Sequence, residues 1–343
     1  MKNIFLVVCL VQASNLYAQF DNRLAPLKNG PAILADHPKY VLPVKNKRRF
    51  ISETLVKDKN ANLSIRAWRF SYNARGIVDV PNRLRGDRTA IVVVHPWGID
   101  DGQGWNSPEP AGVSFFCTPA KNRLYQRHVK EVLNPWLKKL RHRVRVVAYS
   151  LPGKGDPIRT KLYRSVKSNP TQSQRQLAAK LLKKRLTSFS YEGKPIRPTI
   201  DISRQSAKPI VEQYFAQFSG LDSSDRMNGA GFWALPIPVV RQIEVADSDV
   251  VAYDDEGYSV FRDFLKKQGV RHVLLAGYAT DMCVCRTMAG YENLQKDFNV
   301  FLVGDATMAT FPASDSPAAA TQASLCFASL KLFITQVSWI KKK

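Results

Sequence analysis

The chain has 343 residues, of which 45% are hydrophobic and 10% aromatic, and it carries a formal net charge of +23. This composition excludes an intrinsically disordered protein, because enough apolar side chains are present to bury a core. The five cysteines are too few to stabilise a chain of this length by disulfides, so hydrophobic burial must hold the fold together.

The N-terminus is typical of a secretory signal peptide. It reads "MKNIFLVVCLVQASNLYAQF", with one lysine, an apolar run from Ile4 to Val11 and Ala18 at a suitable cleavage point. The apolar run is too short to span a bilayer. We therefore predict a signal peptide over residues 1–18 and an exported mature chain, either periplasmic or secreted.

Residues 19–85 are predicted to form a β-rich N-terminal extension. Alternating runs such as those in "SIRAWRFSYNARGIVDV" are typical of strands with one buried face. The turn-rich stretch "VPNRLRGDR" is expected to connect this extension to the rest of the chain.

From residue 86 to residue 343 strands alternate with helices, which indicates one α/β domain. "TAIVVVHPWG" is apolar without alternation and suits a strand that is covered on both faces. Further strands are expected in "HRVRVVAYSLPGKGD", "VRHVLLAG" and "FNVFLVGDA", and helices in "KNRLYQRHVKEVLNPWLKKLR", "VFRDFLKKQG", "CVCRTMAGYENLQKD" and "PAAATQASLCFASLKLFI". This order predicts a doubly wound, mostly parallel sheet.

The middle of the chain is strongly basic. Residues 121–200 contain 21 Lys and Arg side chains against three acidic ones. Such a field attracts an anionic ligand or surface, although a solvated basic face is the simpler interpretation. No aromatic-rich signature is interleaved with the charges, so we expect no specific nucleic-acid partner. Residues 160–235 are interpreted as an enlarged insertion in the α/β domain.

Cys283 is the main candidate for a catalytic group. Ligands of open α/β sheets bind at the carboxyl ends of the strands, and "VVVHPWGIDDGQGW" and "LLAGYATDMC" both follow such ends. At the start of a helix, Cys283 would have its thiolate stabilised by the helix dipole, and nearby amides could hold an oxyanion. The alternative is a buried structural thiol, for which Cys285 is the better candidate.

The stretch "GVRHVLLAGYATDMCVCRTMAGYENLQKDFNVFLVGDA" resembles the isochorismatase-like cysteine hydrolase superfamily. The matching positions are Gly277, Thr280, Cys283, Val284, Asp305 and Ala306. The resemblance implies a six-stranded, three-layer Rossmann-like sheet and a nucleophilic cysteine that attacks an amide or carbamoyl carbon. It also implies a cis bond between Tyr278 and Ala279 and an oxyanion hole formed by the amides of Ala279 and Cys283. We expect no cofactor.

Two positions depart from the pattern of this superfamily. Where the superfamily has an aspartate after the first strand this chain has His95, and where it has a lysine this chain has Asp255. One hypothesis is a rebuilt triad, in which His95 is the base and Asp255, Asp100 or Asp101 orients it. The other is an altered scaffold that binds an anionic ligand without turnover.

We expect a hydrolase that acts on non-peptide C–N bonds of a small-molecule substrate. No histidine or cysteine spacing indicates a metal site. The identity of the substrate and a homo-oligomeric state are left open by the sequence.

Overall fold

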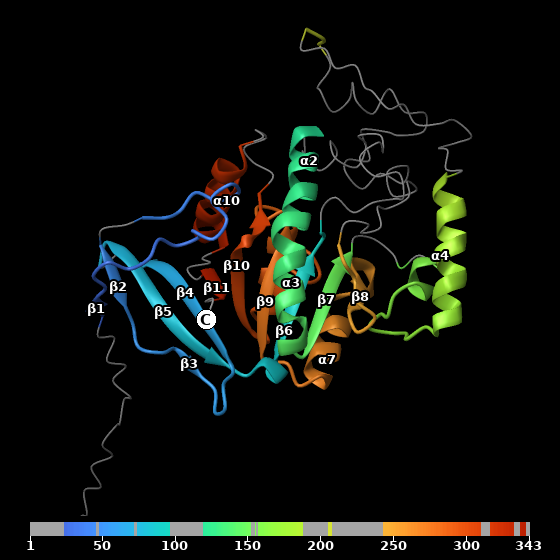
Figure 1. The fold of residues 1–343 in the computed structure, drawn as a ribbon, viewed down its shortest axis with the longest axis horizontal. Coiled ribbons are helices and arrows are strands. Elements are labelled where there is room, and N and C mark those ends of the chain that lie inside the picture. Colours follow the sequence, from blue (N-terminus) through green and yellow to red (C-terminus); the bar gives the residue numbers. More distant parts are fainter. Residues whose placement is uncertain are drawn as a thin grey trace, which may run out of the picture.

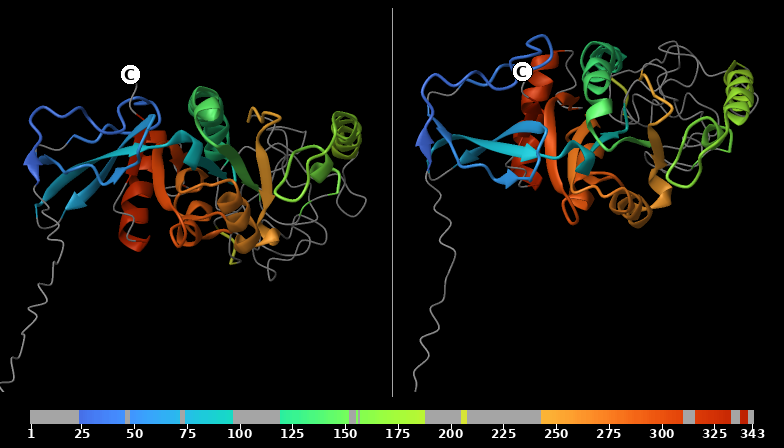
Figure 2. Two further views of the ribbon diagram at one scale, coloured as in Figure 1. Left: turned by 90° about the horizontal axis from the view of Figure 1, so that it is seen from below. Right: turned by 60° about the horizontal axis from the view of Figure 1, so that its bottom comes forward.

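The computed structural model describes residues 24–45, 48–71, 74–96, 119–151, 155, 157–187, 205–207, 243–309, 316–332 and 337–340. The expected signal peptide, Asp100, Asp101 and most of the 160–235 insertion lie outside these residues. Figure 1 shows a long twisted sheet with helices on its faces. In Figure 2, α2 and α3 cover one face, and α7 and α10 cover the other. The predicted doubly wound α/β fold is confirmed.

Six parallel strands form the part of the sheet that carries the site. Their bounds are β6 Thr89–Val94, β7 Val146–Leu151, β8 Val250–Tyr253, β9 His272–Tyr278, β10 Asn299–Met308 and β11 Val337–Ile340. They lie in the order β8-β7-β6-β9-β10-β11, and each is parallel to its neighbours. All residues of β6, β7 and β9 are buried, which explains their apolar sequences without alternation.

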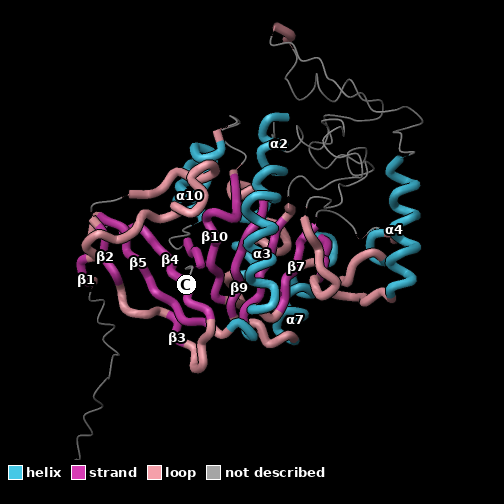
Figure 3. Tube along the Cα trace, viewed as in Figure 1, coloured by secondary structure: helices cyan, strands magenta, loops and turns pink. Residues whose placement is uncertain are grey.

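The extension continues this sheet. Its strands are β1 Ala25–Pro26, β2 Arg49–Ile51, β3 Val56–Lys57, β4 Leu63–Ser71 and β5 Gly76–Leu84. β4 pairs antiparallel with β5 on one side and with β11 on the other, so the strands of both regions form one continuous surface (Figure 3). Strands β2 and β3 pair with β5, and β1 pairs with β2.

The expected connection at "VPNRLRGDR" is wrong, because residues 80–84 belong to β5. Pro81 is tolerated in the strand for a local reason. Its carbonyl accepts a hydrogen bond from Leu55 at 3.1 Å, and on this side β5 faces the gap between β2 and β3. No ladder donor is needed there, so the missing N–H of proline leaves no acceptor without a partner.

The helices follow the parallel strands. They are α2 Pro119–His128, α3 Asn134–Leu140, α4 Gln172–Thr187, α7 Tyr258–Lys267, α8 Cys283–Arg286, α9 Tyr291–Leu294 and α10 Pro317–Leu332. A π-helical turn, Val129–Leu133, joins α2 to α3, and short 3₁₀ turns cover Gly86–Arg88, Arg141–Arg143, Arg159–Lys161 and Asp254–Glu256. No helix in the described ranges is long and apolar enough to cross a membrane.

The single helix expected at "CVCRTMAGYENLQKD" is instead two one-turn helices, α8 and α9. Thr287 ends the first, because its backbone is extended and its Oγ1 donates a hydrogen bond to the Cys283 carbonyl at 2.8 Å. The site therefore lies on a short turn rather than on a long helix.

A buried ion-pair group stabilises the sheet of the extension. Asp79 on β5 is fully buried and accepts hydrogen bonds from Arg49 on β2 at 2.7 and 2.8 Å. Arg66 on β4 forms an ion pair with the same carboxylate. This carboxylate compensates two guanidinium groups that are largely withdrawn from water.

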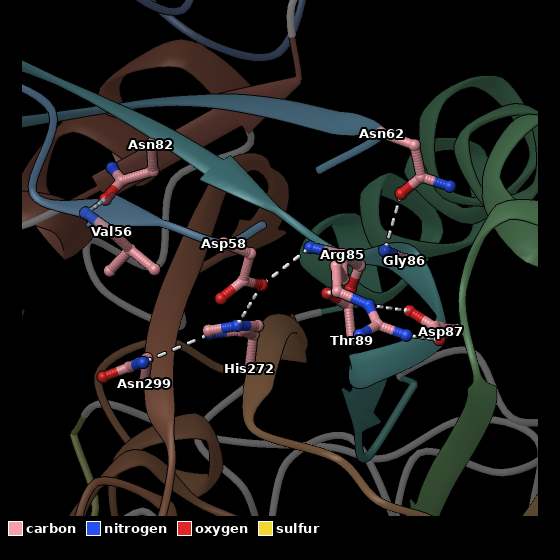
Figure 4. Close-up of polar contacts among 10 residues, drawn as sticks. All are labelled: Val56, Asp58, Asn62, Asn82, Arg85, Gly86, Asp87, Thr89, His272 and Asn299. Atoms are coloured by element: carbon pink, nitrogen blue, oxygen red, sulfur yellow. Dashed lines mark hydrogen bonds and ion pairs between the residues drawn. The ribbon is translucent and has the colours of Figure 1, made fainter. Parts of the chain in front are cut away.

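Polar contacts also join the extension to the amino ends of β9 and β10 (Figure 4). Asn299 donates to Nδ1 of His272 at 3.2 Å, so Nε2–H of His272 donates to Asp58 at 2.9 Å. The backbone amide of Arg85 donates to the same Asp58 oxygen at 2.8 Å. Burial lowers the pKa of His272, which favours this neutral form.

Candidate active site

Four neighbouring strand ends bring the polar residues of the site together. His95 follows β6, Ser150 is near the end of β7, Asp254 follows β8, and Cys283 lies shortly after β9. Because β8, β7, β6 and β9 are adjacent and parallel, their carboxyl ends meet at one edge of the sheet. This edge is where open α/β sheets bind ligands.

His95 is held firmly at the end of β6. Only 2% of its surface is exposed, its φ is +36°, and its backbone amide donates to the Ser150 carbonyl at 2.9 Å. A non-glycine residue in this left-handed region costs about 1–3 kcal/mol and persists only where its surroundings fix it. Its imidazole Nε2 lies 2.9 Å from Oδ2 of Asp254.

The carboxylate that contacts His95 is Asp254, one position before the predicted Asp255. The other Asp254 oxygen, Oδ1, accepts a hydrogen bond from the Ser150 hydroxyl at 3.0 Å, and Ser150 is fully buried. Asp255 is exposed in the same 3₁₀ turn, while Asp100 and Asp101 lie outside the described residues. Asp254 and His95 are each the first residue after a buried strand, a shared signal that could have identified the pair.

Cys283 is the third member of this group. It is buried with 8% of its surface exposed, and its thiol is not in a disulfide. Burial lowers the pKa of His95, but the nearby charges of Cys283 and Asp254 and the hydrogen bond with Asp254 raise the pKa to about 10. Nε2 faces Asp254, whereas Nδ1 is buried and has no hydrogen-bond partner among the described residues.

The turn between β9 and α8 presents backbone amides beside Cys283. The peptide bond between Tyr278 and Ala279 is cis, as the resemblance implied. The Ala279 carbonyl accepts from the amides of Met282 and Val284 at 3.0 and 3.1 Å. Within the described ranges, the amides of Ala279 and Cys283 donate to no other group, so both are available for an oxyanion.

Gly277 allows β9 to lie against β6 directly before His95. Its φ is +111°, and a Cβ atom at this position would lie 2.0 Å from the carbonyl oxygen of Val94. Only glycine fits such a close backbone approach.

Cys285 differs from Cys283 in its surroundings. Its sulfur donates to the Thr280 carbonyl at 2.7 Å, and burial raises the pKa of its thiol to about 12. It is therefore a structural thiol. No group of three or more His, Cys, Asp and Glu side chains that could hold a metal ion is found in the described part of the chain.

Comparisons with known proteins place this site in context. Residues 238–331 match the family model described as the Isochorismatase domain. This match contains Asp254 and Cys283, whereas His95 and Ser150 precede it. No curated protein is significantly similar to the chain in sequence.

Three solved structures are similar to the chain at low sequence identity. A cysteine hydrolase from Pseudomonas syringae pv. phaseolicola is 14% identical, covers 72% of this chain and 87% of its own length, and has a TM-score of 0.30. A pyrazinamidase from Pyrococcus horikoshii, in complex with zinc, is 14% identical over 70% of this chain and 96% of its own, with a TM-score of 0.31. A nicotinamidase from Bacillus subtilis is 12% identical over 72% and 97%, with a TM-score of 0.30.

These TM-scores are too low to support an argument, so the family match carries the assignment together with the residues around Cys283. The segment that contains Asp254 and Cys283 is isochorismatase-like, which confirms the resemblance seen over Gly269 to Thr307.

Proposed function

We propose that the protein is a hydrolase that cleaves a C–N bond of a small amide or carbamoyl compound through Cys283. The observation that carries this proposal is the position of His95, whose Nε2 contacts Asp254 and whose pKa is raised by the charge of the nearby Cys283. A cysteine, a histidine and an aspartate in this order are a nucleophile, a base and a group that orients the base.

The reaction would proceed in two steps. Sγ of Cys283, as the thiolate, forms a bond to the carbonyl carbon, and the negative oxygen accepts hydrogen bonds from the amides of Ala279 and Cys283. The C–N bond then breaks, and protonated His95 gives its proton to the departing nitrogen. In the second step His95 removes a proton from water, the resulting hydroxide displaces the sulfur, and the acid leaves.

The exchange of residue types also favours an active site over a non-catalytic scaffold. The resemblance implies a carboxylate after the first strand, where this chain has the basic His95, and a lysine after β8, where this chain has Asp255 directly beside Asp254, the carboxylate that contacts His95. The exchange is reciprocal, so the site keeps one acidic and one basic group beside the cysteine. A scaffold that only binds a ligand has no need to keep both.

Two further expectations stay predictions. One is export by a signal peptide over residues 1–18, and the other is contact of the basic residues 121–200 with an anionic ligand or surface.

The proposal is tested by alkylation and by turnover in the same preparation. Iodoacetamide should modify Cys283 at pH 7 faster than it modifies a free cysteine, and His95→Ala should remove this advantage, while Cys283→Ser identifies the labelled residue. A set of amides and carbamoyl compounds is then followed by release of ammonia or amine. The proposal is rejected if Cys283 reacts like an ordinary buried thiol and His95→Ala has no effect on its rate.

A further inference from the structure

His128 is a buried histidine that lies behind the turn of the active site. It is the last residue of α2, directly before the π-helical turn, and it has no exposed surface. Its Nδ1 lies 2.5 Å from the hydroxyl of Tyr278, and its Nε2 lies 2.8 Å from the carbonyl oxygen of Asp305. It therefore connects a helix on one face of the sheet with the ends of β9 and β10.

The partners of His128 define its protonation state. A carbonyl oxygen only accepts, so Nε2 carries the proton and donates to Asp305. Nδ1 must then accept from the hydroxyl of Tyr278. Burial lowers the pKa of His128 to about 4 and raises the pKa of Tyr278, so both groups are neutral at physiological pH and the bond keeps this direction.

Tyr278 has little freedom to move away from this bond. Its ring is fully buried and lies 4.9 Å from the ring of Tyr125, and its centroid is 5.6 Å from that of His128. The ring of Tyr40 also packs edge-on against His128, with ring centroids 5.1 Å apart. The hydroxyl is thus fixed at one end of the residue, and the backbone that leads to Ala279 is fixed at the other.

We propose that His128 is a positioning residue that aligns the oxyanion hole through Tyr278. Tyr278 directly precedes Ala279, whose amide would donate to the oxyanion, so a shift of the tyrosine redirects that N–H. This proposal rests on the proposed function of Cys283. His128 does not touch the reacting atoms, and its effect is confined to steps in which a carbonyl oxygen becomes negative.

The test compares two reactions of the same sulfur. Iodoacetamide is attacked at its CH₂ group with loss of iodide, and no oxyanion develops. With p-nitrophenyl acetate the sulfur attacks the carbonyl carbon, an oxyanion develops, and p-nitrophenolate leaves as the thioester forms. The variants are His128→Phe and Tyr278→Phe, which remove the bond and keep a ring. The matched control is Tyr258→Phe, which removes a hydroxyl bonded to Asp297 at 2.7 Å in another part of the fold.

We expect the first two variants to keep the alkylation rate within about twofold and to lose at least about tenfold in acylation, since loss of one whole oxyanion donor costs about 10²–10³-fold. His128→Asn offers an amide oxygen to Tyr278 and should recover part of the acylation rate. Tyr258→Phe should leave both rates unchanged.

Equal loss of both rates, or loss of neither, would overturn the positioning role while the proposed function stands. The wild-type protein should show a burst of p-nitrophenolate, and Cys283→Ser should abolish it. If there is no burst, or if the burst persists in Cys283→Ser, the proposed function itself is overturned. Melting temperatures separate either result from a loss of folded protein.

Discussion

Asp254→Asn preserves the shape of the side chain that contacts His95 and removes its negative charge. The bond between Nε2 and Oδ2 is 2.9 Å long and joins a buried imidazole to a carboxylate with 22% of its side chain exposed. Hydrogen bonds to charged groups contribute about 1.5–3 kcal/mol, and partial solvation of Asp254 favours the lower end. Since a shift of one pKa unit corresponds to about 1.4 kcal/mol, Asp254→Asn should lower the pKa of His95 by about one unit.

The direction of the pKa change of His95 follows from the charges of the two side chains. Asp254 favours the imidazolium form and helps to raise the pKa of His95 to about 10 in the wild-type protein, so its loss moves the basic limb of the Cys283 alkylation profile to lower pH. Acylation by p-nitrophenyl acetate should fall more, by about 10²-fold or greater, because the NH₂ group of asparagine can donate to an unprotonated Nε2 and so favour the wrong tautomer of His95. Asp255→Asn, which changes the neighbouring exposed carboxylate, is the matched control. Identical profiles for the two variants would refute the assignment of Asp254 as the group that orients His95.

Gly277→Ala should lower the free energy of unfolding by about 3 kcal/mol or more, since a methyl group cannot share space with the β6 backbone. In the control Gly269→Ala the added methyl group meets no atom within 4 Å, so the loss of stability should be smaller. Urea denaturation measures both losses, and equal values would contradict the packing argument. Asp79→Ala should cost about 3–5 kcal/mol, because it removes the carboxylate that pairs with the buried Arg49 and the partly buried Arg66, against less than about 1 kcal/mol for the exposed ion-pair carboxylate Asp87. Thermal melts would show whether the order is reversed. His128 is neutral in the folded protein because its pKa is lowered to about 4, so the protein should lose stability as pH falls from about 6.5 towards 4. His128→Asn should make the melting temperature less dependent on pH across that range. An unchanged pH dependence would contradict the assignment of the stability loss to His128.

The parallel core and the place of Cys283 shortly after β9 could be predicted from the sequence because their signals are local. After their first residues, strands β6 and β9 are mainly apolar runs. His95 directly follows β6, and the turn that leads to Cys283 directly follows β9. The contribution of Asp254 was missed by one residue. Which of two consecutive carboxylates turns inward depends on where β8 ends, and a sequence pattern locates strand ends only to within a few residues.

Ser150 and His128 could not be identified in advance for a different reason. Each is a polar residue within a buried element, and each acquires its role only from partners far away in the sequence, Asp254 for Ser150 and Tyr278 for His128. The strand through Pro81 was hidden for the same reason, since its missing donor matters only once the gap between β2 and β3 is known.

The position of β11 has a consequence for the order in which the chain can fold. β11 is the last described strand, and it lies between β10 of the core and β4 of the extension. The hairpin of β4 and β5 can form as soon as it is synthesised. The edge of β4 that faces away from β5, however, stays without a partner until residues 337–340 emerge from the ribosome. Pairing across such a large sequence separation is slow, and an open edge invites pairing with other chains. During synthesis this protein would therefore benefit from a chaperone that shields the β4 edge until β11 arrives.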